Sequence, residues 1–172
     1  MKNTRKIIFL GLMVAQSLVL YIIESLMPVP FIAPGAKLGL ANIITVVSLY
    51  MLTEKQAMGI LLVRIMMSSI FGGGFSAFLN SLTGGIFSFI FMALVKRNEN
   101  YFSIIGTSVA GALFHNIGQL LMASFIIKNL GIYIYFPILA LVSIPTGIFV
   151  GIVSNSMVKK YKILFKSYIQ QI

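Results

Sequence analysis

An apolar run from Phe102 to Ile127 constrains this chain more than any other stretch. As a helix, about 26 residues span roughly 39 Å, which is enough to cross a bilayer with some tilt. The run nevertheless carries polar side chains in its middle, at His115, Asn116 and Gln119. Because a polar group is costly in hydrocarbon, we expect these side chains to face other helices or a watery cavity. The run therefore predicts a membrane-spanning helix that forms the polar wall of a pocket.

Five further apolar segments accompany this run. Only 9% of the 172 residues are charged and 59% are hydrophobic, whereas soluble domains carry roughly 25% charged residues. This pattern predicts an all-α, multi-pass integral membrane protein with six transmembrane helices in a single domain, residues 1–172. The predicted spans are residues 7–27, 38–52, 56–70, 75–95, 102–127 and 135–158.

The basic residues are distributed unevenly between the predicted loops. An even number of spans places both termini on one side of the membrane, and that side collects ten of the Lys and Arg residues. The other side has only Lys37 and Lys128. Because Lys and Arg concentrate in cytoplasmic loops, both termini are predicted to be cytoplasmic. The net charge of +10 is thus explained by the membrane topology and by attraction of the basic residues to anionic lipid. This explanation argues against a nucleic-acid partner.

This topology gives a depth to each polar residue within the spans. The polar residues gather toward the outer side, which predicts a substrate-binding pocket that opens to the outside. Arg64 is expected to hold an anionic or carbonyl group, because its planar fork matches carboxylate and phosphate. The remaining candidates are expected to orient polar atoms of the ligand or to stand beside it, with Asn42 and Asn80 of second rank. The candidate site residues are Arg64, His115, Asn116, Gln119, Asn80, Asn42 and Glu24.

The segment Pro28–Lys37 has three prolines within seven residues, which stops a helix and favours extended backbone. It is nonetheless apolar, so we expect it to pack back onto the helices as a lid over the pocket. Its Phe31, together with Phe75 and Phe78, is expected to give the pocket an apolar lining. Such a lining suits a partly hydrophobic ligand.

Structural interpretations of the same residues stay open. Arg64 could pair with Glu24 and serve stability alone. His115 and Asn116 could be satisfied by backbone carbonyls in a packed bundle. A single His in a chain without Cys is a poor metal site, and the chain has no phosphate-binding loop. No metal, cofactor or catalytic residue is therefore predicted.

Small residues suggest where helices come close together. Gly147 and Gly151 form a G-x-x-x-G pattern, which predicts a close helix contact. In the first span, Gly11 and Ala15 stand four residues apart with Ser17 nearby, which gives that helix a small-residue face.

Three motifs in this order resemble one bacterial family: PGAKLGLANI at Pro34–Ile43, Arg64 in the third span, and SVAGALFHNIGQ at Ser108–Gln119. The family is called heptaprenyl diphosphate synthase component I, or the Gx transporter family. It is in turn similar to the S components of energy-coupling factor (ECF) transporters. That likeness implies a bundle in the bacterial plasma membrane whose outward pocket is covered by the first loop. The resemblance also implies an association with flavin-linked extracellular electron-transfer systems.

The residues do not suit catalysis of prenyl diphosphate synthesis. Such chemistry uses Mg²⁺ held by aspartate-rich motifs, because a hard cation on a diphosphate needs several carboxylates. This chain has no Asp, and its Glu24, Glu54 and Glu99 are scattered. We therefore predict that it is not an enzyme.

These observations favour a membrane solute-binding or uptake protein of the S-component type. Its ligand would be small and partly hydrophobic, such as a vitamin, an isoprenoid or a quinone precursor. The resemblance implies ECF ATPases and a coupling membrane protein as partners, the latter meeting the small-residue face of the first helix. The alternative is a non-catalytic accessory membrane subunit, either of a prenyl diphosphate synthase or of a flavin-linked extracellular electron-transfer system. A scaffold whose polar residues only set helix packing is a third interpretation.

Overall fold

The computed structural model describes residues 2–26, 39–70 and 74–164 of the chain. Within these ranges the chain forms helices and no strand. The helices are α1 (Lys2–Leu26), α2 (Leu40–Met51), α3 (Glu54–Ile70), α4 (Gly74–Arg97), α5 (Ile104–Ile127) and α6 (Phe136–Leu164), with a short 3₁₀ helix η1 (Leu130–Tyr135) before α6. The prediction of an all-α chain with six helices is confirmed.

Within the described ranges, four segments are long and apolar enough to cross a membrane: residues 6–26 of α1, α4, α5, and the stretch 130–163 that joins η1 to α6. The α2 helix is apolar but has only 12 residues. The α3 helix carries Glu54, Lys55 and Arg64 and does not qualify. These helices fit a membrane protein, whereas six membrane crossings stay a prediction. Large apolar side chains cover the outer faces of the molecule, for example Ile70 at 80% and Phe125 at 78% exposure.

The α5 helix packs between α4 and α6 through glycines. A Cβ atom added at Gly118 of α5 would lie 2.8 Å from Gly84 Cα of α4. On the other side, a Cβ at Gly151 of α6 would lie 2.7 Å from Ile105 Cα, and Gly147 makes an equally close contact with α5. The helix contact predicted from the G-x-x-x-G pattern is therefore confirmed, and it lies inside the molecule.

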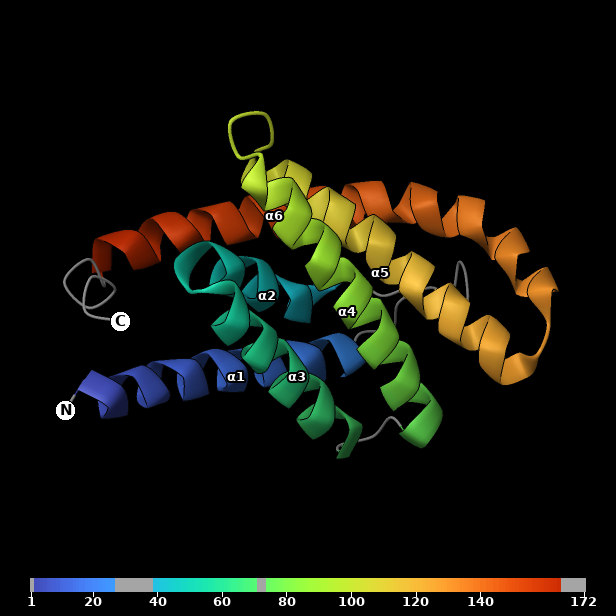
Figure 1. The fold of residues 1–172 in the computed structure, drawn as a ribbon, viewed down its shortest axis with the longest axis horizontal. Coiled ribbons are helices and arrows are strands. Elements are labelled where there is room, and N and C mark those ends of the chain that lie inside the picture. The colour runs from blue at the N-terminus through green and yellow to red at the C-terminus, as the bar shows by residue number, and fades with distance from the viewer. Residues whose placement is uncertain (1, 27–38, 71–73, 165–172) are drawn as a thin grey trace.

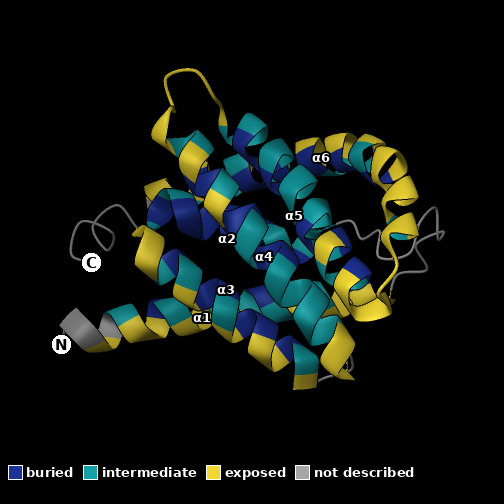
Figure 2. Ribbon diagram, turned by 45° about the vertical axis from the view of Figure 1, so that its right-hand side comes forward, coloured by how far each residue is buried: buried dark blue, intermediate teal, exposed yellow. Residues whose placement is uncertain are grey.

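The short α2 helix is the most enclosed element. Nine of its 12 residues are buried, and it is mainly dark blue in Figure 2. Hydroxyls of two neighbouring helices donate to its backbone: Ser17 Oγ to Ala41 O at 3.2 Å, and Ser154 Oγ to Ile43 O at 3.3 Å. Ser17 is only 1% exposed, so it does not belong to the exposed small-residue face of α1. The exposed small-residue face therefore consists of Gly11 and Ala15. A Cβ atom added at Gly11 would have no neighbouring atom within 4 Å.

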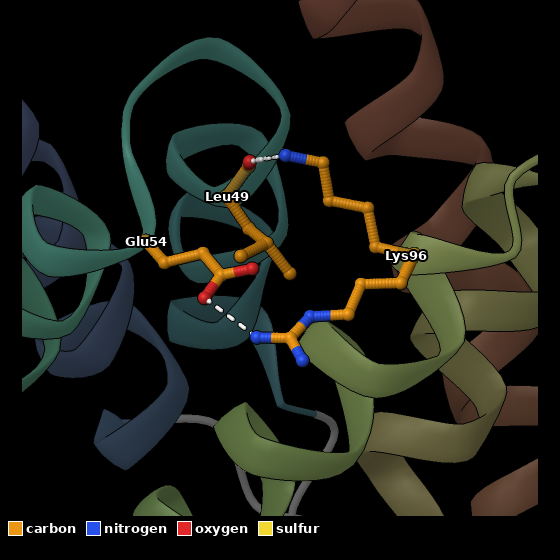
Figure 3. A network of polar contacts seen from close by, with 4 residues as sticks. Leu49, Glu54 and Lys96 are labelled. Atoms are coloured by element: carbon orange, nitrogen blue, oxygen red, sulfur yellow. Dashed lines mark hydrogen bonds and ion pairs between the residues drawn. The ribbon is translucent and has the colours of Figure 1, made fainter.

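The start of α1, the turn between α2 and α3, and the end of α6 lie toward one end of the molecule (Figure 1). Near the same end, the last residues of α4 contact α2 and α3 (Figure 3). Lys96 Nζ donates to Leu49 O at 2.6 Å, and Arg97 lies 3.4 Å from Glu54. The arrangement agrees with basic residues gathered at one end of the helices, and the cytoplasmic placement of that end stays a prediction.

Candidate functional site

A cavity lies between the helices and takes lining residues from all six of them, α1 to α6. We call it the polar cavity, because carboxylate, guanidinium, imidazole, amide and hydroxyl side chains all line it. Its volume is about 60 Å³. One water needs roughly 10–15 Å³ of such space, so the polar cavity holds a few waters or a small polar group.

The polar cavity brings together most of the residues singled out in the sequence. These residues are far apart in the chain and come from α1, α2, α3 and α5. Asn80 of α4 is the exception, because it lines a neighbouring cavity. The predicted residues that line the polar cavity are Glu24, Asn42, Arg64, His115, Asn116 and Gln119.

Arg64 of α3 is one of these lining residues and is buried, with 7% of its surface exposed. Among the described residues, no acceptor lies within hydrogen-bond distance of its Nε, and no carboxylate lies within 4.0 Å of its guanidinium. Glu24 is near enough to act electrostatically on Arg64, but its Oε1 accepts a hydrogen bond from the Gly39 backbone N–H at 2.5 Å. The interpretation of Arg64 as the direct ion-pair partner of Glu24 is therefore not what the structure shows.

Two serines that the sequence pattern does not single out complete the buried polar set. Ser88 of α4 is 2% exposed and Ser108 of α5 is 3% exposed, and both line the polar cavity. Neither hydroxyl has a hydrogen-bond partner among the described residues. A buried polar group without a partner costs about 1–3 kcal/mol. These two hydroxyls and the Arg64 Nε are thus three buried polar groups, on residues that line the cavity, without a partner among the described residues.

The helical spacing of residues along one face of α5 is the sequence pattern from which Ser108 could have been predicted. The α5 residues that line the polar cavity recur every three or four positions, which places them on one face of the helix. Within this stripe, a Cβ added at Gly111 would lie 3.2 Å from Ser88 Oγ and 2.6 Å from Met92 Sδ. Glycine at this position therefore leaves space beside the Ser88 hydroxyl. The stripe consists of Ser108, Gly111, Ala112, His115, Asn116 and Gln119.

Asn116 also has a structural contact with α6. Its Nδ2 donates to Ser143 Oγ at 2.7 Å and to Leu139 O at 3.3 Å. The structural interpretation therefore holds for the amide nitrogen of Asn116, although the residue lines the polar cavity as well. His115 and Gln119 lie directly over α4, since a Cβ at Gly84 would come within 3.2 Å of His115 Cε1 and 2.8 Å of Gln119 Cγ.

A second cavity, which we call the apolar cavity, has a volume of about 240 Å³ and lies between α4, α5, η1 and α6. Gln119 lines both cavities, and Asn80 lines this one with its Oδ1 buried and without a partner among the described residues. The rest of the lining is mostly aliphatic: Leu120, Ala123, Ile127, Ile132, Tyr135 and Leu139.

The predicted apolar lining is wrong for two of its three phenylalanines. Phe75 and Phe78 line neither cavity. Phe75 is 75% exposed and lies 6.4 Å, ring to ring, from Phe78. Phe31 and the predicted lid Pro28–Lys37 lie outside the described residues, although Glu24 and Gly39, on either side of that segment, both line the polar cavity.

The described residues contain no group of three or more His, Cys, Asp or Glu side chains that could hold a metal ion. In the polar cavity, Glu24 and His115 are the members of these types among its lining residues. The side chains that line the polar cavity supply hydrogen-bond donors and acceptors and charges of both signs.

The family model described as heptaprenyl diphosphate synthase component I matches residues 13–157 of the chain. The matched range includes every residue named above for the two cavities. No curated protein matches the chain. No solved structure matches it either.

Proposed function

The chain belongs to the heptaprenyl diphosphate synthase component I family, and on that premise we propose that it is a non-catalytic, membrane-embedded binding subunit. It binds a small, partly hydrophobic molecule from the outer side of the bacterial plasma membrane, and the polar cavity holds the polar group of that molecule. The ligand presents an oxyanion or carbonyl oxygen to Arg64. Vitamins, isoprenoids and quinone precursors include molecules of this kind.

One observation carries the proposal: three buried polar groups of residues that line the polar cavity have no hydrogen-bond partner among the described residues. Arg64 Nε can only donate, whereas the hydroxyls of Ser88 and Ser108 can donate or accept. Removing a guanidinium from water costs several kcal/mol. At more than 4 Å, the attraction of Glu24 offsets less than about 4 kcal/mol at an effective dielectric constant of 20. A ligand that brings acceptor oxygens would satisfy all three donors.

The positions of the carboxylates support a subunit without catalytic activity. Glu24 is in the polar cavity, Glu54 lies at the start of α3 beside Arg97, and Glu99 is exposed after α4. A Mg²⁺–diphosphate site needs several oxygen ligands around one ion. The name of the family, a component of a synthase, supports the view that any synthase activity requires a partner subunit.

Uptake of the S-component type would use ECF ATPases and a coupling membrane protein. The exposed Gly11 and Ala15 on α1 support a docking face for such a protein. In this proposal, the end of the molecule that holds the start of α1 and the end of α6 faces the cytoplasm (Figure 1).

The second candidate is an accessory subunit that anchors a partner, either a prenyl diphosphate synthase or an extracellular flavin-linked electron-transfer protein. The family name favours the synthase. Gentle affinity isolation from the native membrane separates the two candidates. ATPases and a coupling protein in the isolate would support uptake, whereas a synthase or a flavoprotein would support anchoring.

The test of binding is native mass spectrometry of the protein in lipid nanodiscs, followed by identification of the small molecules released. We expect a stoichiometric ligand in the unchanged protein and a loss of at least tenfold in Arg64→Gln and in His115→Ala. Arg97→Gln is the matched control, because Arg97 is exposed and lies 3.4 Å from Glu54, away from the cavity lining. Equal retention in Arg64→Gln and Arg97→Gln would refute the role of Arg64. An empty unchanged protein that also fails to bind added acetate or phosphate would leave the anchoring role in its place.

A further inference from the structure

We infer that the ligand is an amphiphile, with an oxyanion head in the polar cavity and a hydrocarbon group in the apolar cavity. This inference rests on the proposed function, because it assigns a ligand class to the same site. It adds a second compartment, the apolar cavity, and a junction between the compartments at Gln119.

The sizes of the two cavities indicate which part of the ligand each one holds. The polar cavity, at about 60 Å³, has room for a head group such as a carboxylate or a phosphate and for little more. The apolar cavity, at about 240 Å³, is larger than the roughly 150 Å³ cavity that binds benzene in an engineered protein core. It therefore takes a ring or a chain larger than benzene.

The lining of the apolar cavity is built to receive hydrocarbon. Leu120 and Leu139 are 5% and 3% exposed and form a small cluster with Ile132, separate from the main apolar core. The space is open on one side, because two other lining residues, Ile127 and Tyr135, are 61% and 38% exposed. A hydrocarbon group that enters it would contact the two buried leucines on the inner side.

The wall shared by the two cavities is polar and lies where α4 packs closely on α5. Gln119 lines both cavities, and Asn80, whose Oδ1 is buried without a partner among the described residues, stands next to Ser81 of the polar cavity. The side chain of Gln119 packs directly on Gly84. A ligand that reaches from one cavity to the other passes these two amides, and a hydrogen-bond donor on the ligand would satisfy the Asn80 oxygen.

If the site has two compartments, the affinity for a ligand should depend on both its oxyanion head and its hydrocarbon chain. A hydrophilic anion fills only the polar cavity, and a neutral hydrocarbon leaves the Arg64 Nε and the serine hydroxyls without acceptors. A single-chain carboxylate and a single-chain phosphate ester share the required chemistry. Their relative affinities report which oxyanion the head position accepts.

The experiment measures dissociation constants for acetate, octanoate, inorganic phosphate, octyl phosphate and octan-1-ol on the full chain in nanodiscs, corrected for partition into empty nanodiscs. We expect octanoate or octyl phosphate to bind at least tenfold more tightly than its short counterpart, and octan-1-ol to bind no better than it binds to empty nanodiscs. Ala123→Phe fills the apolar cavity and should remove the gain from the chain while short-anion affinity stays within twofold. Leu121→Phe, two residues away and outside both cavity linings, should keep the gain.

The outcomes separate the inference from the proposed function. Short anions that bind through Arg64 without any gain from the chain would overturn the amphiphile and leave the proposed function standing. Retention of the full gain in Ala123→Phe would overturn the amphiphile in the same way. Failure of every oxyanion to bind would overturn both. Ala123→Leu fills less space and replaces Ala123→Phe if the larger variant does not give a monodisperse helical protein.

Discussion

Replacing Gly118 by alanine tests the packing on which the site depends. The new Cβ would lie 2.8 Å from Gly84 Cα, 2.8 Å from Thr83 O and 3.1 Å from Gly84 N, whereas ordinary contact begins at 3.4 Å. All three atoms belong to the α4 backbone, so no side chain can rotate away and the two helices must separate. Overpacking of this kind costs about 1–3 kcal/mol.

The same substitution at Gly11 is the matched control. A Cβ at Gly11 meets nothing within 4 Å, so Gly11→Ala should keep only the intrinsic gain of alanine over glycine in a helix, about 0.5–1 kcal/mol. Because both variants contain this gain, the difference between their free energies of unfolding isolates the overpacking cost. We expect Gly118→Ala to be less stable than Gly11→Ala by about 1–3 kcal/mol.

Unfolding in mixed micelles of increasing denaturing detergent gives the two free energies under identical conditions. Ligand retention measured beside them should fall in Gly118→Ala, because His115 and Gln119 line the cavity from the same stretch of α5, and should be unchanged in Gly11→Ala. Two variants that agree within about 0.5 kcal/mol would refute a backbone contact this close, since unrelated surface substitutions agree to that extent.

Two further predictions concern hydrogen bonds between helices, and both are measured as changes in the free energy of unfolding. Lys96→Met removes the ammonium that donates to a carbonyl at the end of α2 and should cost about 1–2 kcal/mol, whereas Arg97→Gln should stay within about 0.5 kcal/mol because its ion pair is exposed; equal costs would contradict this ranking. Asn116→Ala removes two hydrogen bonds to α6 and should cost about 1–3 kcal/mol, and Asn155→Ala, whose side chain makes no hydrogen bond with the described residues, is its control; a neutral Asn116→Ala would show that these bonds contribute nothing.

The helices could be predicted from the sequence because their signals are local. Apolar runs, the glycines after Ile70 and the polar residues after Arg97 mark where helices end, and the structure has six helices as expected. Whether a helix crosses the membrane is harder to predict for α2 and α3, which are not among the four candidate spans. The 12 described residues of α2 rise about 18 Å at 1.5 Å per residue, against about 30 Å of hydrocarbon, so its membrane crossing stays a prediction from the sequence.

The cavity could be predicted only where polarity stood out against an apolar background. His115, Asn116 and Gln119 were conspicuous for that reason, and the cavity lining includes all three. Ser88 and Ser108 were not, because a serine in an apolar helix usually bonds a carbonyl one turn back. Ser68 does so, with Ile65 O at 3.0 Å. The exceptional serines are recognised only when the packing of α4 and α5 is known.

The helices on the two sides of the polar cavity are held together by different kinds of contact. This difference determines how a bound ligand would stabilise the protein. The α4, α5 and α6 side is fixed by backbone atoms in direct contact at the glycines. Around α1 and α2, the contacts include single hydrogen bonds such as the one between Glu24 and the Gly39 N–H. Arg64 belongs to α3, whereas the donors of Ser88 and Ser108 belong to the glycine-packed side. An oxyanion that accepts from all three would therefore join the two sides. It should raise the stability of the protein by about 2.7 kcal/mol at one hundred times its dissociation constant. In Arg64→Gln, where binding is expected to weaken at least tenfold, the gain at the same ligand concentration should fall to about 1.4 kcal/mol or less.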